Sequence, residues 1–292
     1  MINFEKQFFP QGKERKDLLK SNAEGINKAQ EEDRLEMREN HNYGNIDSHL
    51  EKEGASFSYF FRNILPEGQK DLRSYVESSF KEKQGKALGV EFGGVGSNLF
   101  RGFSKGFFKE TFGITLADHR EKWKTKIDAY KNSKHKLDHN VIEGDILSDN
   151  LYDNLEEKLN GRKVDIIIER MFLGIEFMPA EPYKLSSILE KWYVMLNEGG
   201  IMFIQSPVVF NNLLDKWAEM LHDKYIDSIE FQYEKGIHDA AVENEGYSSF
   251  RLRKLKGAPK DLPFLDSKTV ARTEKWISSE KEKSKNFDWY LK

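Results

Sequence analysis

The chain has 292 residues, 46 basic and 49 acidic side chains, a formal net charge of −3 and no cysteine. This charge balance provides no overall field to hold a polyanion, so nucleic acid is not an expected partner. The lack of cysteine excludes disulfides, thiolate nucleophiles, zinc–thiolate sites and cysteine-held iron–sulfur clusters. No apolar run approaches the roughly 20 residues that cross a bilayer, and no signal-peptide core is evident, so we expect a cytoplasmic protein.

The first 84 residues differ in character from those that follow. Residues 18–40 are dominated by charged and amide side chains, which predicts a polar helix. FSYFFRNIL (57–65) and LRSYVESSF (72–80) carry aromatic residues at helical spacing, which predicts short helices that pack on another part of the chain or line an apolar pocket. We therefore expect a helical N-terminal region, 1–84, that acts either as a lid or as a solvated arm.

Residues 85–256 alternate strand-length apolar runs with amphipathic segments. Residues 184–196 have apolar side chains at helical spacing, and residues 210–225 are expected to form another helix. The last two apolar runs have no strong helical segment between them. This pattern predicts an α/β fold with a doubly wound, mostly parallel seven-stranded sheet and an antiparallel edge hairpin. Residues 257–292 form a charged C-terminal extension. The expected strands are 86–92, 113–118, 139–145, 163–170, 199–205, 227–234 and 246–255.

The stretch VEFGGVGSNLF (90–100) predicts a sharp, glycine-rich turn that leaves a buried strand beside a ligand. A dinucleotide fingerprint beginning at Gly94 would place Leu99 where a small residue is required. Glu91, at the strand end, would also repel the doubly charged pyrophosphate. A ligand that carries an ammonium and a sulfonium but no phosphate would be attracted instead, and S-adenosylmethionine is such a ligand.

Two further carboxylates follow later strands. Asp118 ends the second apolar run, about 20 residues beyond Gly96, where a carboxylate can accept hydrogen bonds from both ribose hydroxyls. Asp145 follows the third run, within reach of an adenine amino group if the strands are neighbours. Structural alternatives stay open, because Glu91 could cap a strand, Asp118 a helix, and Asp145 a turn.

With these motifs in this order, the chain resembles the class I S-adenosylmethionine-dependent methyltransferases over roughly residues 86–255. The similar segments are EFGGVGS (91–97), LADHR (116–120), GDI (144–146), VDIII (164–168) and LNEGGIMFI (196–204). The resemblance implies S-adenosylmethionine as cofactor, with the glycine loop against its methionine part, Asp118 on the ribose and Asp145 on the adenine. The implied cofactor-binding residues are Glu91, Gly93, Gly94, Gly96, Asp118, His119, Asp145 and Ile146, with His119 and Ile146 flanking the adenine ring.

The chain departs from the family pattern in two places. Val95 and Ser97 stand where many members have glycine. After the fourth strand the sequence is IERMFLG (168–174) and not a loop of the Asn-Pro-Pro-Tyr type, which disfavours N-methylation of adenine or glutamine. Carboxylates in GDILSDNLYDN (144–154) have no spacing typical of a metal loop, so no metal is expected.

The expected activity is methyl transfer by in-line displacement to an acceptor, which we take to be a small molecule. Glu169 and Arg170 are the candidate catalytic residues, because open parallel sheets bind ligands at the carboxyl ends of their strands. A local ion pair that covers the strand end is the structural alternative for this pair. Two other functions stay open: a non-catalytic binding module that retains the fold, and a nicotinamide-dependent oxidoreductase, which Glu91 and Leu99 disfavour.

Overall fold

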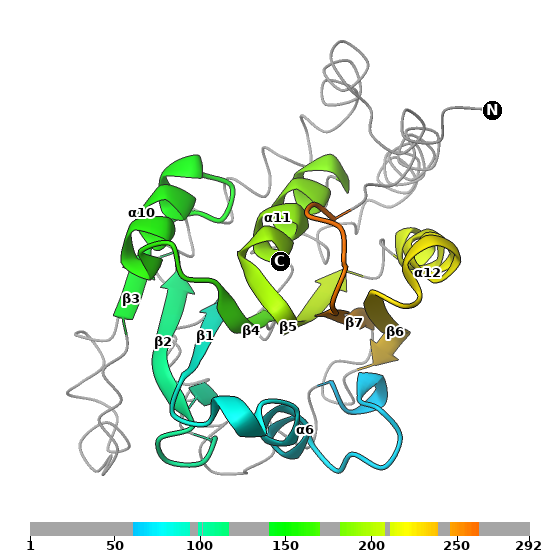
Figure 1. Ribbon diagram of the computed structural model, residues 1–292. Coiled ribbons are helices and arrows are strands. Elements are labelled where there is room, and N and C mark those ends of the chain that lie inside the picture. The colour runs from blue at the N-terminus through cyan, green and yellow to red at the C-terminus, as the bar shows by residue number, and fades with distance from the viewer. Residues whose placement is uncertain are drawn as a thin grey trace.

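The sheet predicted from the sequence is present. The computed structural model describes residues 61–93, 99–100, 102–116, 140–169, 182–207, 211–238 and 246–262. Seven strands pair in the order β3-β2-β1-β4-β5-β7-β6, and β7 runs antiparallel to both of its neighbours while the other pairs are parallel (Figure 1). The strands are β1 (Ala87–Phe92), β2 (Phe108–Thr115), β3 (Asn140–Glu143), β4 (Val164–Glu169), β5 (Leu196–Pro207), β6 (Ile229–His238) and β7 (Gly246–Lys254).

The helices lie on both faces of the sheet (Figure 1). Three of them, in residues 72–80, 184–196 and 210–225, were expected from the sequence. FSYFFRNIL contributes a short 3-10 helix where a helix was expected, and its first residues lie outside the described part of the chain. The described helices are η1 (Arg62–Ile64), α6 (Leu72–Ser79), η2 (Lys81–Lys83), α10 (Asp149–Leu159), α11 (Pro182–Met195) and α12 (Asn211–Tyr225).

The helix α10 was not predicted. Its apolar residues Leu151, Leu155 and Leu159 recur every four positions, so they form one buried stripe. Asn160 ends the helix in the left-handed conformation, and its N–H donates to the carbonyls of Glu156 and Glu157. The acidic residues between the leucines are exposed, so the apolar stripe of the helix is narrow.

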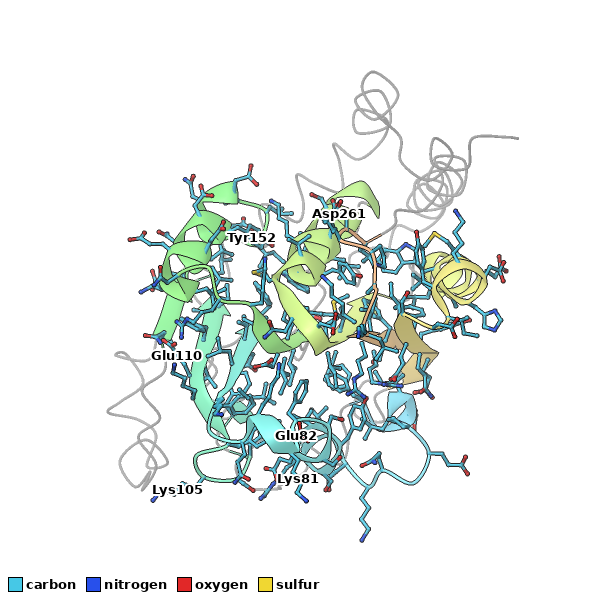
Figure 2. All side chains as sticks on the ribbon, in the orientation of Figure 1. Lys81, Glu82, Lys105, Glu110, Tyr152 and Asp261 are labelled. Atoms are coloured by element: carbon cyan, nitrogen blue, oxygen red, sulfur yellow. The ribbon has the colours of Figure 1, made fainter. Side chains whose placement is uncertain are left out.

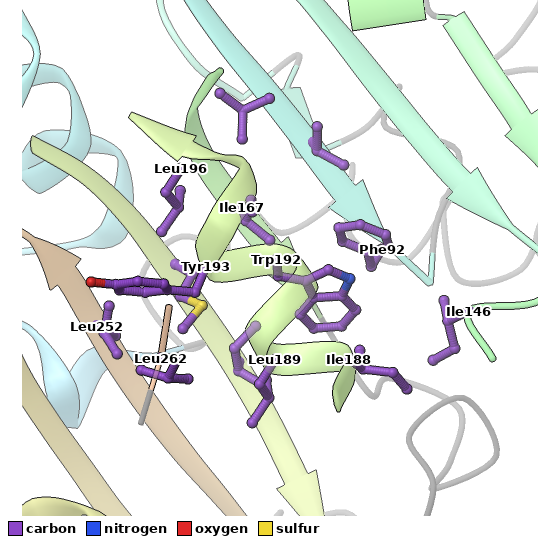
Figure 3. Packing of buried hydrophobic residues seen from close by; sticks show 14 of the residues in the cluster. Phe92, Ile146, Ile167, Ile188, Leu189, Trp192, Tyr193, Leu196, Leu252 and Leu262 are labelled. Carbon is purple, nitrogen blue, oxygen red and sulfur yellow. The ribbon is translucent and has the colours of Figure 1, made fainter. Parts of the chain in front are cut away.

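One face of the sheet is covered by α10, α11 and α12, which pack on the larger apolar core. Within it, the ring of Phe92 at the end of β1 stacks on the indole of Trp192 from α11, with centroids 4.2 Å apart and an interplanar angle of 23° (Figure 3). The neighbouring Tyr193 donates its hydroxyl to the carbonyl of Pro259 at 2.7 Å. Burial, the largest cause, raises the pKa of Tyr193 far above its ordinary value, so this donor stays protonated.

The opposite face is covered by η1, α6 and residues 99–100 and 102–107, which form a second apolar core. The ring of Phe61 packs on Phe203 of β5 with centroids 5.4 Å apart. Gly89 of β1 admits the ring of Phe100, because a Cβ there would lie 2.7 Å from the ring. At least one aromatic residue of FSYFF therefore packs on the sheet, which is one of the two uses expected for this segment.

A buried polar network ties this cover to the sheet. Arg251 of β7 is 5% exposed, and its guanidinium donates to the carbonyl of Ile64 at 2.9 Å and to the hydroxyl of Tyr75 at 2.7 Å. The same side chain donates to Glu230 at 3.0 Å and to Gln232 at 3.2 Å on β6. Because a buried charge is tolerated only when it is paired and hydrogen-bonded, these contacts explain why an arginine occupies this position.

A second buried network lies where β4 begins. Asp165 accepts hydrogen bonds from Lys83 at 2.6 Å, from Asn197 at 2.8 Å and from the backbone N–H of Leu88 at 2.9 Å. These contacts join the starts of β1, β4 and β5, at the edge of the sheet opposite the carboxyl ends of the parallel strands. Among the described residues, no helix is both long enough and apolar enough to span a membrane.

Candidate functional site

The carboxyl ends of β1, β2, β3 and β4 meet at one edge of the sheet, because these neighbouring strands are parallel. Backbone hydrogen bonds join the chain just beyond the strands: the N–H of Gly93 donates to the carbonyl of Ile114 at 3.0 Å, and that of Gly144 to Thr115 at 2.9 Å. The sheet therefore brings part of the predicted site to one edge. The predicted residues placed there are Glu91, Gly93, Asp145, Ile146 and Glu169.

Glu91 is a buried carboxylate on a central strand. Its side chain is 2% exposed, and its neighbours in register are Gly113 on β2 and Ile168 on β4. Side chains alternate along a strand, so Glu91 lies on the same face as Gly89, the face that Phe100 covers. An acidic side chain at this position would repel a phosphate and attract a cationic ligand group.

The turn after Glu91 requires glycine at its first described position. Gly93 has a φ of 80°, in the left-handed region that side-chain-bearing residues rarely adopt. Gly93 has no Cβ and lies two residues after the buried Glu91. The backbone at this turn can therefore pass close to a bound molecule.

Asp145 orients the turn that follows β3. Its carboxylate accepts a hydrogen bond from the backbone N–H of Leu147 at 2.8 Å, and its carbonyl accepts from the N–H of Ser148 at 2.8 Å. This is the turn role foreseen as the alternative to adenine binding. Since the first bond uses Oδ1, the two roles are compatible. Binding of adenine by Asp145 stays a prediction.

Ile146 packs into the core beside this turn. It is 6% exposed, and its carbonyl accepts a hydrogen bond from the hydroxyl of Tyr152 at 2.9 Å. Figure 3 shows its side chain on the same face of the sheet as Phe92 and Trp192. Ile146 is thus held in place at the edge where the resemblance puts the adenine ring.

Glu169 is the last residue of β4 and is 1% exposed. Its partner in register is Phe92, so its side chain lies on the α11 face of the sheet, opposite to that of Glu91. Two buried carboxylates thus end the two central strands of the sheet.

Five predicted site residues lie outside the described part of the chain: Gly94, Gly96, Asp118, His119 and Arg170. Their roles stay predictions. Within the residues that the structure describes, no group of three or more His, Asp or Glu side chains is arranged to hold a metal ion.

Phe92 was not among the predicted site residues, although it separates Glu91 from Gly93. Its stacking on Trp192 fixes the last residue of β1 directly before the turn. The signals were present in the sequence, because Val90 and Phe92 share one face of the strand and Trp192 belongs to the apolar stripe of α11. Their spatial pairing was not evident from either segment alone.

A groove of about 480 Å³ lies between α10 and α11, away from these strand ends. Tyr152 and Asp261, both labelled in Figure 2, are among the residues that line it. Lys191 spans part of it, 2.5 Å from Asp149 and 4.4 Å from the centre of the Tyr152 ring. The hydrogen bond from Lys191, followed by its positive charge, holds the pKa of Asp149 below its ordinary value. None of the predicted site residues lines this groove.

No protein-family model matches the chain, and no curated protein matches its sequence. Solved structures with a similar fold include an rRNA methylase from Streptococcus thermophilus, which is 13% identical, with 65% of this chain and 100% of that chain covered and a TM-score of 0.40. The plantazolicin methyltransferase BpumL in complex with S-adenosylhomocysteine is 11% identical, with 84% and 100% covered and a TM-score of 0.43. The N-methyltransferase NodS from Bradyrhizobium japonicum is 15% identical, with 63% and 96% covered and a TM-score of 0.32.

The class of fold follows from the sheet itself. A seven-stranded sheet in the order β3-β2-β1-β4-β5-β7-β6, with β7 alone antiparallel, is the arrangement of the class I methyltransferase fold. The chain therefore has the Rossmann-like fold that the sequence predicted. The likenesses to solved structures are too distant to say anything about the acceptor.

Proposed function

We propose that the protein is an S-adenosylmethionine-dependent methyltransferase that acts on a small-molecule acceptor. The observation that carries this proposal is the buried carboxylate of Glu91 at the carboxyl end of β1, with Gly93 in the left-handed conformation two residues later. A dinucleotide would bring its pyrophosphate to this position, where the carboxylate would repel it. A ligand with an ammonium and a sulfonium matches the charge of the site.

The residues present suit this cofactor. Glu91 and the glycine loop would hold the methionine part, Asp118 the ribose hydroxyls and Asp145 the adenine amino group. The oxygen Oδ1 of Asp145 is already held by the N–H of Leu147, so the carboxylate is oriented before any ligand binds. The full proposed set is Glu91, Gly93, Gly94, Gly96, Asp118, His119, Asp145 and Ile146.

When bound, S-adenosylmethionine would supply a methyl group on a sulfonium that is already a good leaving group. The protein therefore has mainly to orient the acceptor in line and exclude water. Glu169 and Arg170 are proposed to face the acceptor at the end of β4. A hydroxyl acceptor would need a base, for which Glu169 is the described candidate, whereas a neutral amine would need only orientation.

Calorimetric titration with S-adenosylmethionine, S-adenosylhomocysteine and NAD tests this proposal. We expect the first two to bind and NAD not to bind. Glu91→Gln should weaken S-adenosylhomocysteine binding at least tenfold, or about 1.4 kcal/mol. Glu143→Gln is the matched control, because Glu143 is an exposed carboxylate at the end of β3, which β2 separates from β1.

The titrations also separate the alternatives. Binding of NAD in preference to S-adenosylhomocysteine would favour an oxidoreductase. If neither ligand binds to folded protein, the chain is a module that retains the fold without the cofactor. An equal loss of affinity in Glu91→Gln and Glu143→Gln would show a general charge effect and not a specific contact.

A further inference from the structure

The antiparallel strands β6 and β7 carry a row of polar side chains on the face that η1 covers. The other face of these strands is apolar, because Phe231, Phe250 and Leu252 belong to the core beneath α12. Antiparallel pairing places the polar residues in three cross-strand pairs. The pairs are Glu230 with Arg253, Gln232 with Arg251, and Glu234 with Ser249.

Two of these pairs are electrostatically balanced. Arg251 donates to Glu230 and to Gln232, and Arg253 lies 3.9 Å from Glu230. The carboxylate of Glu230 thus has two guanidinium groups beside it. This part of the row is a structural ion-pair network.

The third pair lacks such a balance. Glu234 uses Oε1 to accept a hydrogen bond from the amide of Asn63 at 2.7 Å, but its Oε2 is buried and has no hydrogen-bond partner. Opposite it, Ser249 is 0% exposed, and its hydroxyl also has no partner. Within the part of the chain that the structure describes, a carboxylate oxygen and a hydroxyl therefore lie buried and unpaired on facing strands, a costly arrangement unless a ligand completes it.

The pair lies toward the same edge of the sheet as the candidate site. Ser249 pairs with Gln205 on β5. Gln205 lies two residues beyond Phe203, and Phe203 pairs with Ile168 near the end of β4. A β-bulge follows Glu234 directly, since the register with β7 shifts between Glu234 and Ile237. Bulges of this kind redirect side chains and are frequent beside active sites.

We propose that Glu234 and Ser249 form a subsite for a cationic group of the acceptor, either an ammonium or a guanidinium. This inference rests on the proposed methyltransferase function and names the class of acceptor. Such a cation donates several hydrogen bonds and carries a positive charge, so it satisfies both Oε2 of Glu234 and the oxygen of Ser249.

The subsite anchors the acceptor at a distance from the reacting atom. Three strand spacings separate β6 from β4, or about 14 Å. A protonated amine also has no lone pair with which to attack a methyl group. The acceptor is therefore an extended molecule with a cationic group at one end and the methylated atom toward the other, held in line by remote binding energy.

The test uses Glu234→Gln, which removes the charge but keeps an oxygen to accept the hydrogen bond from Asn63. Glu198→Gln is the matched control, because it removes the same charge at an exposed position near the start of β5, away from the site. The probes are spermidine, as an extended cation, and 1,8-octanediol, as a neutral molecule of similar length. Binding is measured by calorimetry, and melting temperatures are recorded without ligand.

We expect spermidine to bind to the wild type and to Glu198→Gln, and to bind to both more tightly than octanediol does. The affinity of Glu234→Gln for spermidine should be at least tenfold lower than that of the wild type. Without ligand, Glu234→Gln should melt at the same temperature as the wild type or higher, because Glu234 makes no ion pair with any residue that the structure describes. Equal binding of spermidine by both variants, or no binding by the wild type, would overturn the subsite. A lower melting temperature of Glu234→Gln with unchanged binding would assign Glu234 a structural role instead.

Titration of the same samples with S-adenosylhomocysteine keeps the two proposals apart. If S-adenosylhomocysteine binds and spermidine does not, the subsite is wrong and the methyltransferase assignment stands. If spermidine binds through Glu234 and S-adenosylhomocysteine does not bind, the cationic subsite stands and the methyltransferase assignment is wrong.

Discussion

Arg251 and Tyr75 are joined by a buried hydrogen bond of 2.7 Å, although 176 positions separate them in the sequence. The guanidinium also lies 5.2 Å from the centre of the tyrosine ring, so charge, hydrogen bond and aromatic face all contribute to one contact. Because Arg251 belongs to β7 and Tyr75 to α6, this contact fixes the N-terminal cover on the sheet.

Tyr75→Phe should lower the free energy of unfolding by about 1.5 kcal/mol, since one hydrogen bond to a charged group is lost while the ring is kept. Urea unfolding measures the change. The control is Tyr225→Phe, because among the described residues no hydrogen bond to the Tyr225 hydroxyl occurs. Equal losses in the two variants would show that the contact with Arg251 adds nothing specific.

Truncation separates the N-terminal cover from the residues that precede it. Deleting residues 1–84 should prevent folding, because it exposes Ile166, Ile168, Ile201 and Phe203, which η1 and α6 cover. Deleting residues 1–54 should leave S-adenosylhomocysteine affinity within a few-fold but abolish turnover of an acceptor, if this segment closes over the acceptor side. Circular dichroism measures folding, calorimetry measures S-adenosylhomocysteine affinity, and a methylation assay measures turnover. A shorter protein, lacking 1–54, that methylates at the full-length rate would contradict the proposed lid.

Asp145 can be tested for its two roles separately. Asp145→Asn keeps an oxygen for the N–H of Leu147 but removes the charge, so its melting temperature should change little while cofactor affinity falls several-fold. Asp145→Ala loses the turn bond as well and should be less stable by about 1 kcal/mol. Unfolding and calorimetric titration of both variants provide the readouts. Unchanged affinity in both would leave Asp145 with its turn role alone.

The strands could be predicted because each is a short apolar run, and β1 and β4 appear almost residue for residue. The start of β2 could not be predicted, since Phe108–Glu110 mixes polar and apolar residues that are only partly buried. The helix α10 was missed because its apolar stripe is only three leucines among acidic residues. Contacts such as Glu234 opposite Ser249 depend on the register of strands, which local sequence patterns do not specify.

The ion pair of Asp149 with Lys191 predicts a pH dependence. The folded protein holds the pKa of Asp149 below its ordinary value of 3.8, so the carboxylate contributes stability above that value. The contribution is lost as the pH falls from 3.8 through the lowered pKa. Asp149→Asn should therefore be slightly less stable than the wild type at pH 7, and the difference should vanish near pH 2. Urea unfolding at the two pH values measures it, and a difference that persists in acid would contradict the ion pair as its source.

The most direct test of the methyltransferase assignment is the melting temperature of the full-length protein with and without S-adenosylhomocysteine. A ligand that binds only the folded state stabilises it by mass action, by about 2.7 kcal/mol at 100 times its dissociation constant. We predict a clear rise in melting temperature that grows with ligand concentration and is smaller for Glu91→Gln. No rise at millimolar S-adenosylhomocysteine, in protein shown to be folded, would contradict the assignment.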